Sequence, residues 1–137
     1  MKQKFISFYI DVAKRVAELS YAERLKVGAV IVKDHRILSY GFNGTPAGFD
    51  NCCEYEVNGS LVTKPEVIHA ETNAILKLTR HGDSCLGGSI FITHAPCMEC
   101  AKLILQSGIQ QVYFNKHYRD DSGVALLQKG NITVTNI

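Results

Sequence analysis

Four side chains in two short segments of this 137-residue chain could bind a metal ion and move protons beside it. His69 and Glu71 stand two residues apart, and Cys97 and Cys100 follow Pro96 with two residues between them. One imidazole and two thiolates can hold Zn²⁺ and leave a position for water, whereas closed structural zinc sites use four protein ligands. A nearby carboxylate can carry protons to and from that water. The pattern predicts an enzyme with Zn²⁺ held by His69, Cys97 and Cys100 and with Glu71 as its catalytic residue.

The two cysteines alone allow two interpretations. A C-x-x-C pair in a reduced α/β protein is often a redox pair, and that interpretation competes with metal binding. Cys97 and Cys100 would share one face of a helix that begins near Pro96, where free amide groups and the helix dipole favour thiolates. The histidine and glutamate of the other segment favour zinc binding by the two cysteines over a redox pair.

His69 and Glu71 can face one site only under a condition on the backbone. Two residues in a regular helix are separated by about 200°, so they point in nearly opposite directions. We therefore expect His69 at or before the first turn of its helix. Without the cysteines, Glu71 would be read as a favourable charge at a helix N-terminus.

The elements that position these residues can be predicted from hydrophobic spacing and from glycine and proline. The alternation of strands and helices predicts an α/β layered sheet, partly parallel, in a single domain over 1–137. Asp34-His35 should form a tight turn, and Gly82 and Gly108 should end helices. We expect helices at 5–20, 65–80, 97–106 and 122–128, strands at 27–32, 36–41, 89–93, 109–114 and 132–134, and a long functional loop at 42–65.

Composition limits the kind of protein. A net charge of +2, with no long run of Lys or Arg, argues against a polynucleotide partner, and no apolar run is long enough to cross a membrane. Phe5 to Ile10 is soon followed by charged residues, which fits an amphipathic helix better than an export signal. Five cysteines favour reduced thiols and a cytoplasmic location. Cys85 should be buried, whereas the adjacent Cys52 and Cys53 leave open a second, structural metal site.

Five segments resemble the cytidine/deoxycytidylate deaminase superfamily and, within it, the deoxycytidylate (dCMP) deaminases. They follow the family's order over nearly the whole chain. The resemblance implies a three-layer α/β/α sandwich with a five-stranded mixed sheet, and hydrolysis of dCMP to dUMP for thymidylate synthesis. In that reaction Glu71 would act first as a base and then as an acid. The segments are Val27–Val32, Gly41–Pro46, Ile68–Ile75, Thr93–Lys102 and Tyr118–Asp120.

The resemblance also implies how a nucleotide would be bound. Asn43 matches an asparagine that contacts the sugar, although it could instead hold a turn of its loop. His94 would line the nucleotide pocket, with packing as the alternative. The residues expected at the substrate are Lys26, Asn43, Ala70, His94 and Tyr118, with Arg24 and Arg119 as further partners of the phosphate.

Regulation is a further implication of the resemblance. Many family members are hexamers that dCTP activates and dTTP inhibits together with Mg²⁺, so we expect a homo-oligomer with nucleotide effectors. Phe42 replaces the usual tyrosine or tryptophan, which keeps stacking and removes a polar contact. Some relatives carry a second zinc in the loop that here holds Cys52 and Cys53 but no histidine. The expected effector residues are Gly41, Phe42, Asn43 and Gly44.

Two alternatives remain open at this point. One is a deaminase for another substrate, such as tRNA adenosine, dCTP, free cytosine or guanine. The other is a non-catalytic zinc module that binds nucleic acid, which would need a fourth protein ligand.

Overall fold

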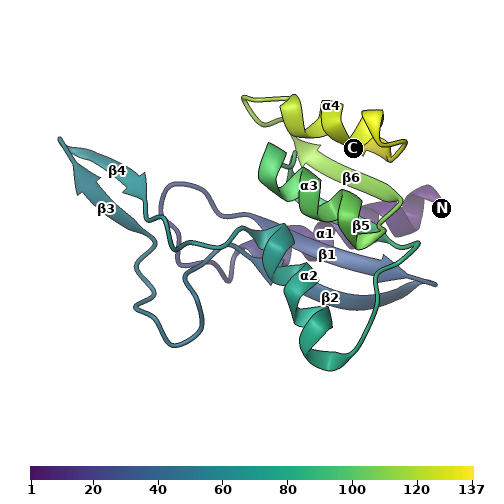
Figure 1. Ribbon diagram of the computed structural model, residues 1–137, viewed down its shortest axis with the longest axis horizontal. Coiled ribbons are helices and arrows are strands. Elements are labelled where there is room, and N and C mark those ends of the chain that lie inside the picture. Colours follow the sequence, from purple (N-terminus) through teal and green to yellow (C-terminus); the bar gives the residue numbers. More distant parts are fainter.

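A computed structural model describes all residues, 1–137, and shows one five-stranded sheet with helices on both faces (Figure 1). A separate two-stranded hairpin projects from one end. The elements are α1 (Gln3–Ala17), β1 (Gly28–Lys33), β2 (Arg36–Phe42), β3 (Glu54–Val57), β4 (Ser60–Thr63), α2 (Ala70–His81), β5 (Ser89–His94), α3 (Met98–Ser107), β6 (Gln111–Lys116), α4 (Ser122–Lys129) and β7 (Thr133–Asn136).

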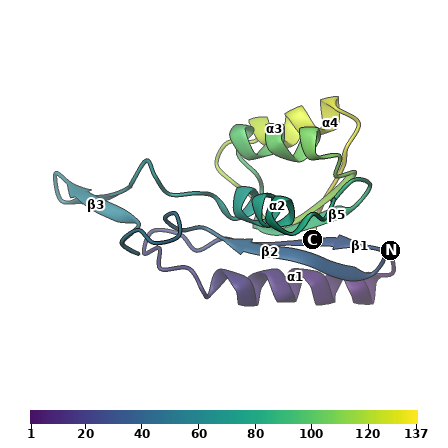
Figure 2. The same ribbon diagram turned by 60° about the horizontal axis from the view of Figure 1, so that its bottom comes forward.

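The sheet is mixed, with strand order β2-β1-β5-β6-β7. Strand β1 is antiparallel to both β2 and β5, whereas β6 is parallel to both β5 and β7. Helix α1 covers one face of the sheet, and α2, α3 and α4 lie on the other (Figure 2). The predicted α/β/α layers and five-stranded mixed sheet are confirmed. None of the helices is both long and apolar enough to span a bilayer.

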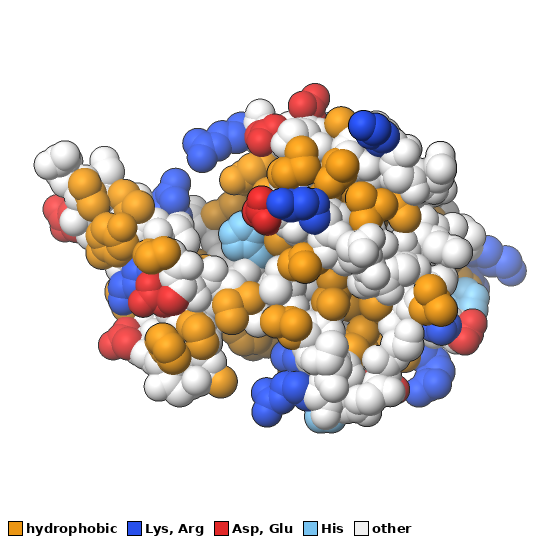
Figure 3. All heavy atoms as spheres, in the orientation of Figure 1, with side chains coloured by type: hydrophobic (Ala, Val, Ile, Leu, Met, Phe, Trp, Pro, Cys, Tyr) orange, Lys and Arg blue, Asp and Glu red, His pale blue; other side chains and the backbone are white.

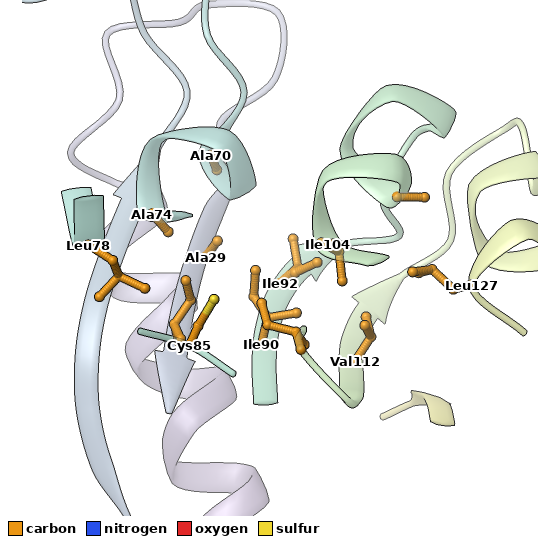
Figure 4. Packing of buried hydrophobic residues seen from close by; sticks show 13 residues of the cluster. Ala29, Ala70, Ala74, Leu78, Cys85, Ile90, Ile92, Ile104, Val112 and Leu127 are labelled. Atoms are coloured by element: carbon orange, nitrogen blue, oxygen red, sulfur yellow. The ribbon is translucent and has the colours of Figure 1, made fainter. Parts of the chain in front are cut away.

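Alternate residues of the central strands fill two hydrophobic cores, one on each face of the sheet. From β1, Ala29 and Ile31 join the core under α2 and α3, and Val30 and Val32 join the core under α1. Continuous burial of this kind is expected where helices cover both faces of a sheet. Cys85 belongs to the first core and is buried, as predicted (Figure 4).

Two glycines let helices lie directly on strands β1 and β2. A Cβ on Gly28 would come 2.1 Å from the carbonyl oxygen of Ala13 in α1. A Cβ on Gly41 would come 2.4 Å from the carbonyl oxygen of Ala70 and 2.5 Å from the amide nitrogen of Ala74 in α2. The close approach at Gly41 fixes the start of α2, which is the end of the helix that carries His69.

The hairpin of β3 and β4 corrects the prediction of one long loop over 42–65. Its turn is Asn58-Gly59, where both residues have positive φ, 51° and 80°. An Asn-Gly pair between short extended runs is a strong hairpin signal, so the sequence did contain this information. Neither strand joins the main sheet, and the hairpin stands away from the layered body (Figures 1 and 2).

Most other predicted elements are present with shifted ends, and two shifts matter. Helix α1 ends at Ala17 rather than near Ser20. Helix α2 begins at Ala70 rather than near Pro65, because Gly44 and Ile68 exchange backbone hydrogen bonds of 3.1 and 2.8 Å and hold the preceding segment extended. That extended approach decides the geometry of the site described next.

Candidate active site

The N-termini of α2 and α3 bring three side chains with metal-binding atoms together. His69 is the N-cap residue of α2, Cys97 is the N-cap residue of α3, and Cys100 follows in the first turn of α3. Nδ1 of His69 lies 3.5 Å from Sγ of Cys97 and 3.4 Å from Sγ of Cys100. The three donor atoms all lie within 4.8 Å of one another. The two segments that were singled out in the sequence therefore meet at one point.

These distances fit a tetrahedral zinc ion. With Zn–S near 2.3 Å and Zn–N near 2.0 Å, a nitrogen and a sulfur on one tetrahedral zinc are separated by about 3.5 Å. The observed separations of 3.5 and 3.4 Å agree with that value. No other histidine, cysteine or carboxylate joins the group, so three protein ligands leave room for a solvent molecule.

The two thiols differ in the ease with which they lose a proton. Hydrogen bonds from Cys100 and His69 lower the pKa of Cys97 far below its usual value. The pKa of Cys100 is raised, chiefly because its thiol hydrogen-bonds to Cys97 and also because it is buried. Cys97 is therefore the first thiolate of the site. The free amides at the start of α3 favour that negative charge as well.

Glu71 lies within the same site although it is only two residues from His69. The backbone of His69 is extended, with φ −71° and ψ 156°, and the helix starts after it. The condition set out from the sequence is therefore met, and both residues line one cavity. Glu71 is only 4% exposed, and its burial raises the pKa of its carboxyl group to about 6.

The cavity has a volume of about 620 Å³ and lies where β5 and β6 end. Such a volume suits a small molecule such as a nucleotide. Its walls come from the segment before β1, the base of the hairpin, the N-termini of α2 and α3, and the segment after β6. In Figure 3 a hollow with a histidine side chain separates the projecting hairpin from the rest of the molecule.

Most of the substrate-binding residues predicted from the sequence lie in this cavity. Asn43 lines it, but its side chain also holds the backbone: Oδ1 accepts a hydrogen bond from Val27 N at 2.9 Å, and Nδ2 donates to Leu25 O at 2.8 Å. An amide retains one further donor and one further acceptor after two such bonds. The predicted residues that line the cavity are Arg24, Asn43, Ala70, His94, Tyr118 and Arg119.

Four predicted residues lie outside the cavity walls. Lys26 is exposed and does not line the cavity, although its neighbours Leu25 and Val27 do. Of the expected effector residues only Asn43 reaches the cavity, whereas Gly41, Phe42 and Gly44 do not line it.

Sequence reasoning missed three residues with acidic or basic side chains in the cavity. Lys116 ends β6 and His117 follows it, and both line the cavity. Their position at the end of a predicted strand could have indicated this role, because ligands bind beyond the carboxyl ends of parallel strands. Glu54 is the third, and it was missed together with the hairpin that begins with it.

No set of ligands for a second metal site is present around Cys52 and Cys53. Cys53 is buried and Cys52 is exposed, with its thiol 3.1 Å from the carbonyl oxygen of Glu54. The cluster of His69, Cys97 and Cys100 is the one group of three or more metal-binding side chains in the molecule.

Residues 3–116 match the sequence model described as the cytidine and deoxycytidylate deaminase zinc-binding region. The chain belongs to this family. The predictions of family membership and of a zinc-dependent enzyme are confirmed, and the non-catalytic zinc module is no longer a competing interpretation.

Relatives with known names extend the similarity over nearly the whole chain. ComE operon protein 2 of Bacillus subtilis is 34% identical over 95% of this chain and 69% of its own length. Deoxycytidylate deaminase of Mycobacterium phage D29 is 36% identical over 80% of this chain and 92% of its own. The crystal structure of dCMP deaminase from the cyanophage S-TIM5, in complex with dCMP and dUMP, matches with a TM-score of 0.94 and 41% identity over 100% of this chain and 99% of that one.

Proposed function

We propose that this protein hydrolyses dCMP to dUMP and ammonia within a single deaminase domain. The observation that carries the proposal is the match over the full length, at 41% identity, to a phage dCMP deaminase whose structure contains dCMP and dUMP. The cavity of about 620 Å³ beside the His69–Cys97–Cys100 cluster supports it with a volume suited to a nucleotide.

In the proposed reaction His69, Cys97 and Cys100 would hold Zn²⁺, which would lower the pKa of a water molecule towards neutrality. Glu71 accepts the proton from this water and passes it to the ring nitrogen next to C4 of the cytosine. After oxygen has added to C4, Glu71 takes the remaining proton from the new hydroxyl group and delivers it to the amino group; the C4–N bond breaks, the C4 carbonyl forms and ammonia leaves. Water thus supplies the new oxygen of dUMP. Since Glu71 is buried, bulk solvent has little access to the protons that it transfers.

We propose that the phosphate is bound by the cationic side chains of the cavity wall. Arg24, Lys116 and Arg119 all line the cavity, and the hydroxyl of Tyr118 can donate a further hydrogen bond. Lys116 replaces Lys26 in this role, since Lys26 was predicted from the sequence but does not line the cavity. The spare donor and acceptor of Asn43 are available to the sugar.

A deamination assay with purified, zinc-loaded protein tests the proposal. The substrates are dCMP, CMP, dCTP, cytidine and a tRNA, with released ammonia and the ultraviolet spectrum as readouts. We expect the highest kcat/KM with dCMP, and a large loss from CMP to cytidine, because these two differ only in the phosphate. Faster turnover of dCTP or tRNA adenosine than of dCMP would assign the enzyme to another branch of the family.

The same proposal includes supply of dUMP for thymidylate synthesis in the cytoplasm, a hexamer, and control by dCTP and by dTTP with Mg²⁺. These points rest on the resemblance to the family. Asn43 supports a link between effector and substrate, because it belongs to the Gly41–Gly44 segment and also lines the cavity. The tests are the molar mass in solution and the dependence of rate on dCMP with and without each effector. A monomer that neither nucleotide affects would contradict this part of the proposal.

A further inference from the structure

A buried carboxylate at the base of the hairpin has no role in the reaction described so far. Glu54 begins β3, is only 6% exposed, and lines the same cavity as Glu71. Its Oε2 accepts two hydrogen bonds, from the backbone amides of Glu23 and Arg24, at 3.0 Å each. Buried charged groups of this kind need polar partners, and here one oxygen has two.

The second carboxylate oxygen of Glu54, Oε1, has different surroundings from Oε2. Oε1 has no hydrogen-bond partner in the protein, whereas Oε2 has two. No fully buried side-chain nitrogen or oxygen of the molecule lacks a partner, so Oε1 is not sealed in the interior. Because Glu54 lines the cavity, Oε1 is an accessible acceptor on the cavity wall.

The base of the hairpin holds this oxygen in place. Glu54 and Thr63 are partners across the hairpin, and both bind the segment before β1. Oε2 of Glu54 accepts from the amides of Glu23 and Arg24, and Nη1 of Arg24 donates to Oγ1 of Thr63 at 3.0 Å. Because this acceptor is already held in place, little side-chain entropy is lost when a ligand binds to it.

We infer that Oε1 of Glu54 accepts a hydrogen bond from the 3′-hydroxyl of the substrate sugar, which makes Glu54 a specificity-determining residue. The inference rests on the proposed function. An ionised carboxylate only accepts hydrogen bonds, so its partner must be a donor. The phosphate is an acceptor and carries the same sign of charge. The exocyclic amine of the base leaves at Glu71, so the 3′-hydroxyl is the donor that remains on a deoxynucleotide.

The first test compares two substrates on the wild-type enzyme. In 2′,3′-dideoxycytidine 5′-monophosphate the 3′-hydroxyl is absent and the base and phosphate are unchanged. We expect kcat/KM to be about 10- to 100-fold lower than with dCMP, because a hydrogen bond to a charged group is lost. Equal kcat/KM for the two substrates would overturn the inference and leave the proposed function intact. Failure to convert dCMP at all would instead contradict the proposed function.

The second test uses Glu54→Gln, whose carbonyl oxygen can keep the two backbone hydrogen bonds while an NH₂ group replaces Oε1. With dCMP we expect about a 10- to 100-fold lower kcat/KM, mainly through KM. With the dideoxynucleotide we expect the variant and wild type to be equal. The same loss on both substrates would refute the contact. Glu56→Gln is the matched control, since Glu56 is exposed on the same strand and does not line the cavity, and it should leave both rates unchanged.

Discussion

Gly123 in the first turn of α4 lies directly against the backbone of Cys97. A Cβ at position 123 would come 2.8 Å from the carbonyl carbon and oxygen of Cys97 and 2.2 Å from the carbonyl oxygen of Pro96. Helix α4 packs along α3, so it supports the segment that carries a metal-binding cysteine from behind. A helix with no residue in the metal cluster thus contributes to its geometry.

Gly123→Ala should therefore weaken zinc binding as well as the fold. The added methyl group must displace backbone atoms, for which overpacking typically costs about 1–3 kcal/mol. The melting temperature and the zinc affinity, measured by competition with a chromophoric chelator, should both fall. Gly44→Ala is the control, because a Cβ there meets nothing within 4 Å. If Gly123→Ala binds zinc as tightly as the control, α4 does not support the site.

Thr72→Val should lower zinc affinity without removing a ligand. Oγ1 of Thr72 lies 3.7 Å from Sγ of Cys100, and it can donate a hydrogen bond to this sulfur as a thiolate. Loss of such outer contacts typically costs about 10- to 100-fold in metal affinity. Thr72→Ser keeps the hydroxyl group and should restore most of the affinity. Equal zinc affinity in all three proteins would show that the contact is only packing.

The metal cluster could be predicted from sequence because it depends on the spacing of residues within two short segments. The H-x-E and P-C-x-x-C spacings fix which residues share a helix terminus, and His69, Cys97, Cys100 and Glu71 were all identified in this way. The sheet could be predicted because continuous apolar strands alternate with helices bounded by residues such as Gly82 and Gly108, both of which have positive φ in the structure.

The rest of the cavity depends on contacts between segments that are distant in the chain. Lys116 enters it only because β6 lies parallel to β5, which places Lys116 beside His94. Glu54 enters it only because the hairpin binds the segment before β1. The sequence therefore predicted the residues of the reaction better than the residues of the cavity wall that contact the substrate.

His94 should titrate below the usual histidine range. Burial lowers its pKa, and the charge of Lys116 lowers it further. In Lys116→Met the pKa of His94 should rise towards 6.5 without reaching it, because burial remains. An NMR titration of the ring protons measures this. Lys102→Met removes the same charge from α3, where Lys102 pairs with Glu99 at 2.9 Å, and should leave the pKa of His94 unchanged.

The lowered pKa of His94 also sets the sign of its effect on stability. The unfolded chain binds a proton at this residue near pH 6.5, before the folded protein does, so protonation favours unfolding. The contribution of His94 is fully present above that pH and is lost as the pH falls through the lower value of the folded state. In Lys116→Met the free energy of unfolding should depend less on pH below about 6.5. An unchanged pH dependence would contradict the assigned influence of Lys116.

The most direct test of the central claim is to measure dUMP formed from dCMP by the zinc-loaded wild type and by Glu71→Gln, with zinc per chain determined on the same samples. Glu71 lines the cavity beside the cluster but is not one of its three metal-binding residues. We predict dUMP formation by the wild type, a loss of about 100- to 10,000-fold in the variant, and about one zinc per chain in both. Undiminished turnover by Glu71→Gln, or unchanged dCMP with the zinc-loaded wild type, would contradict the account.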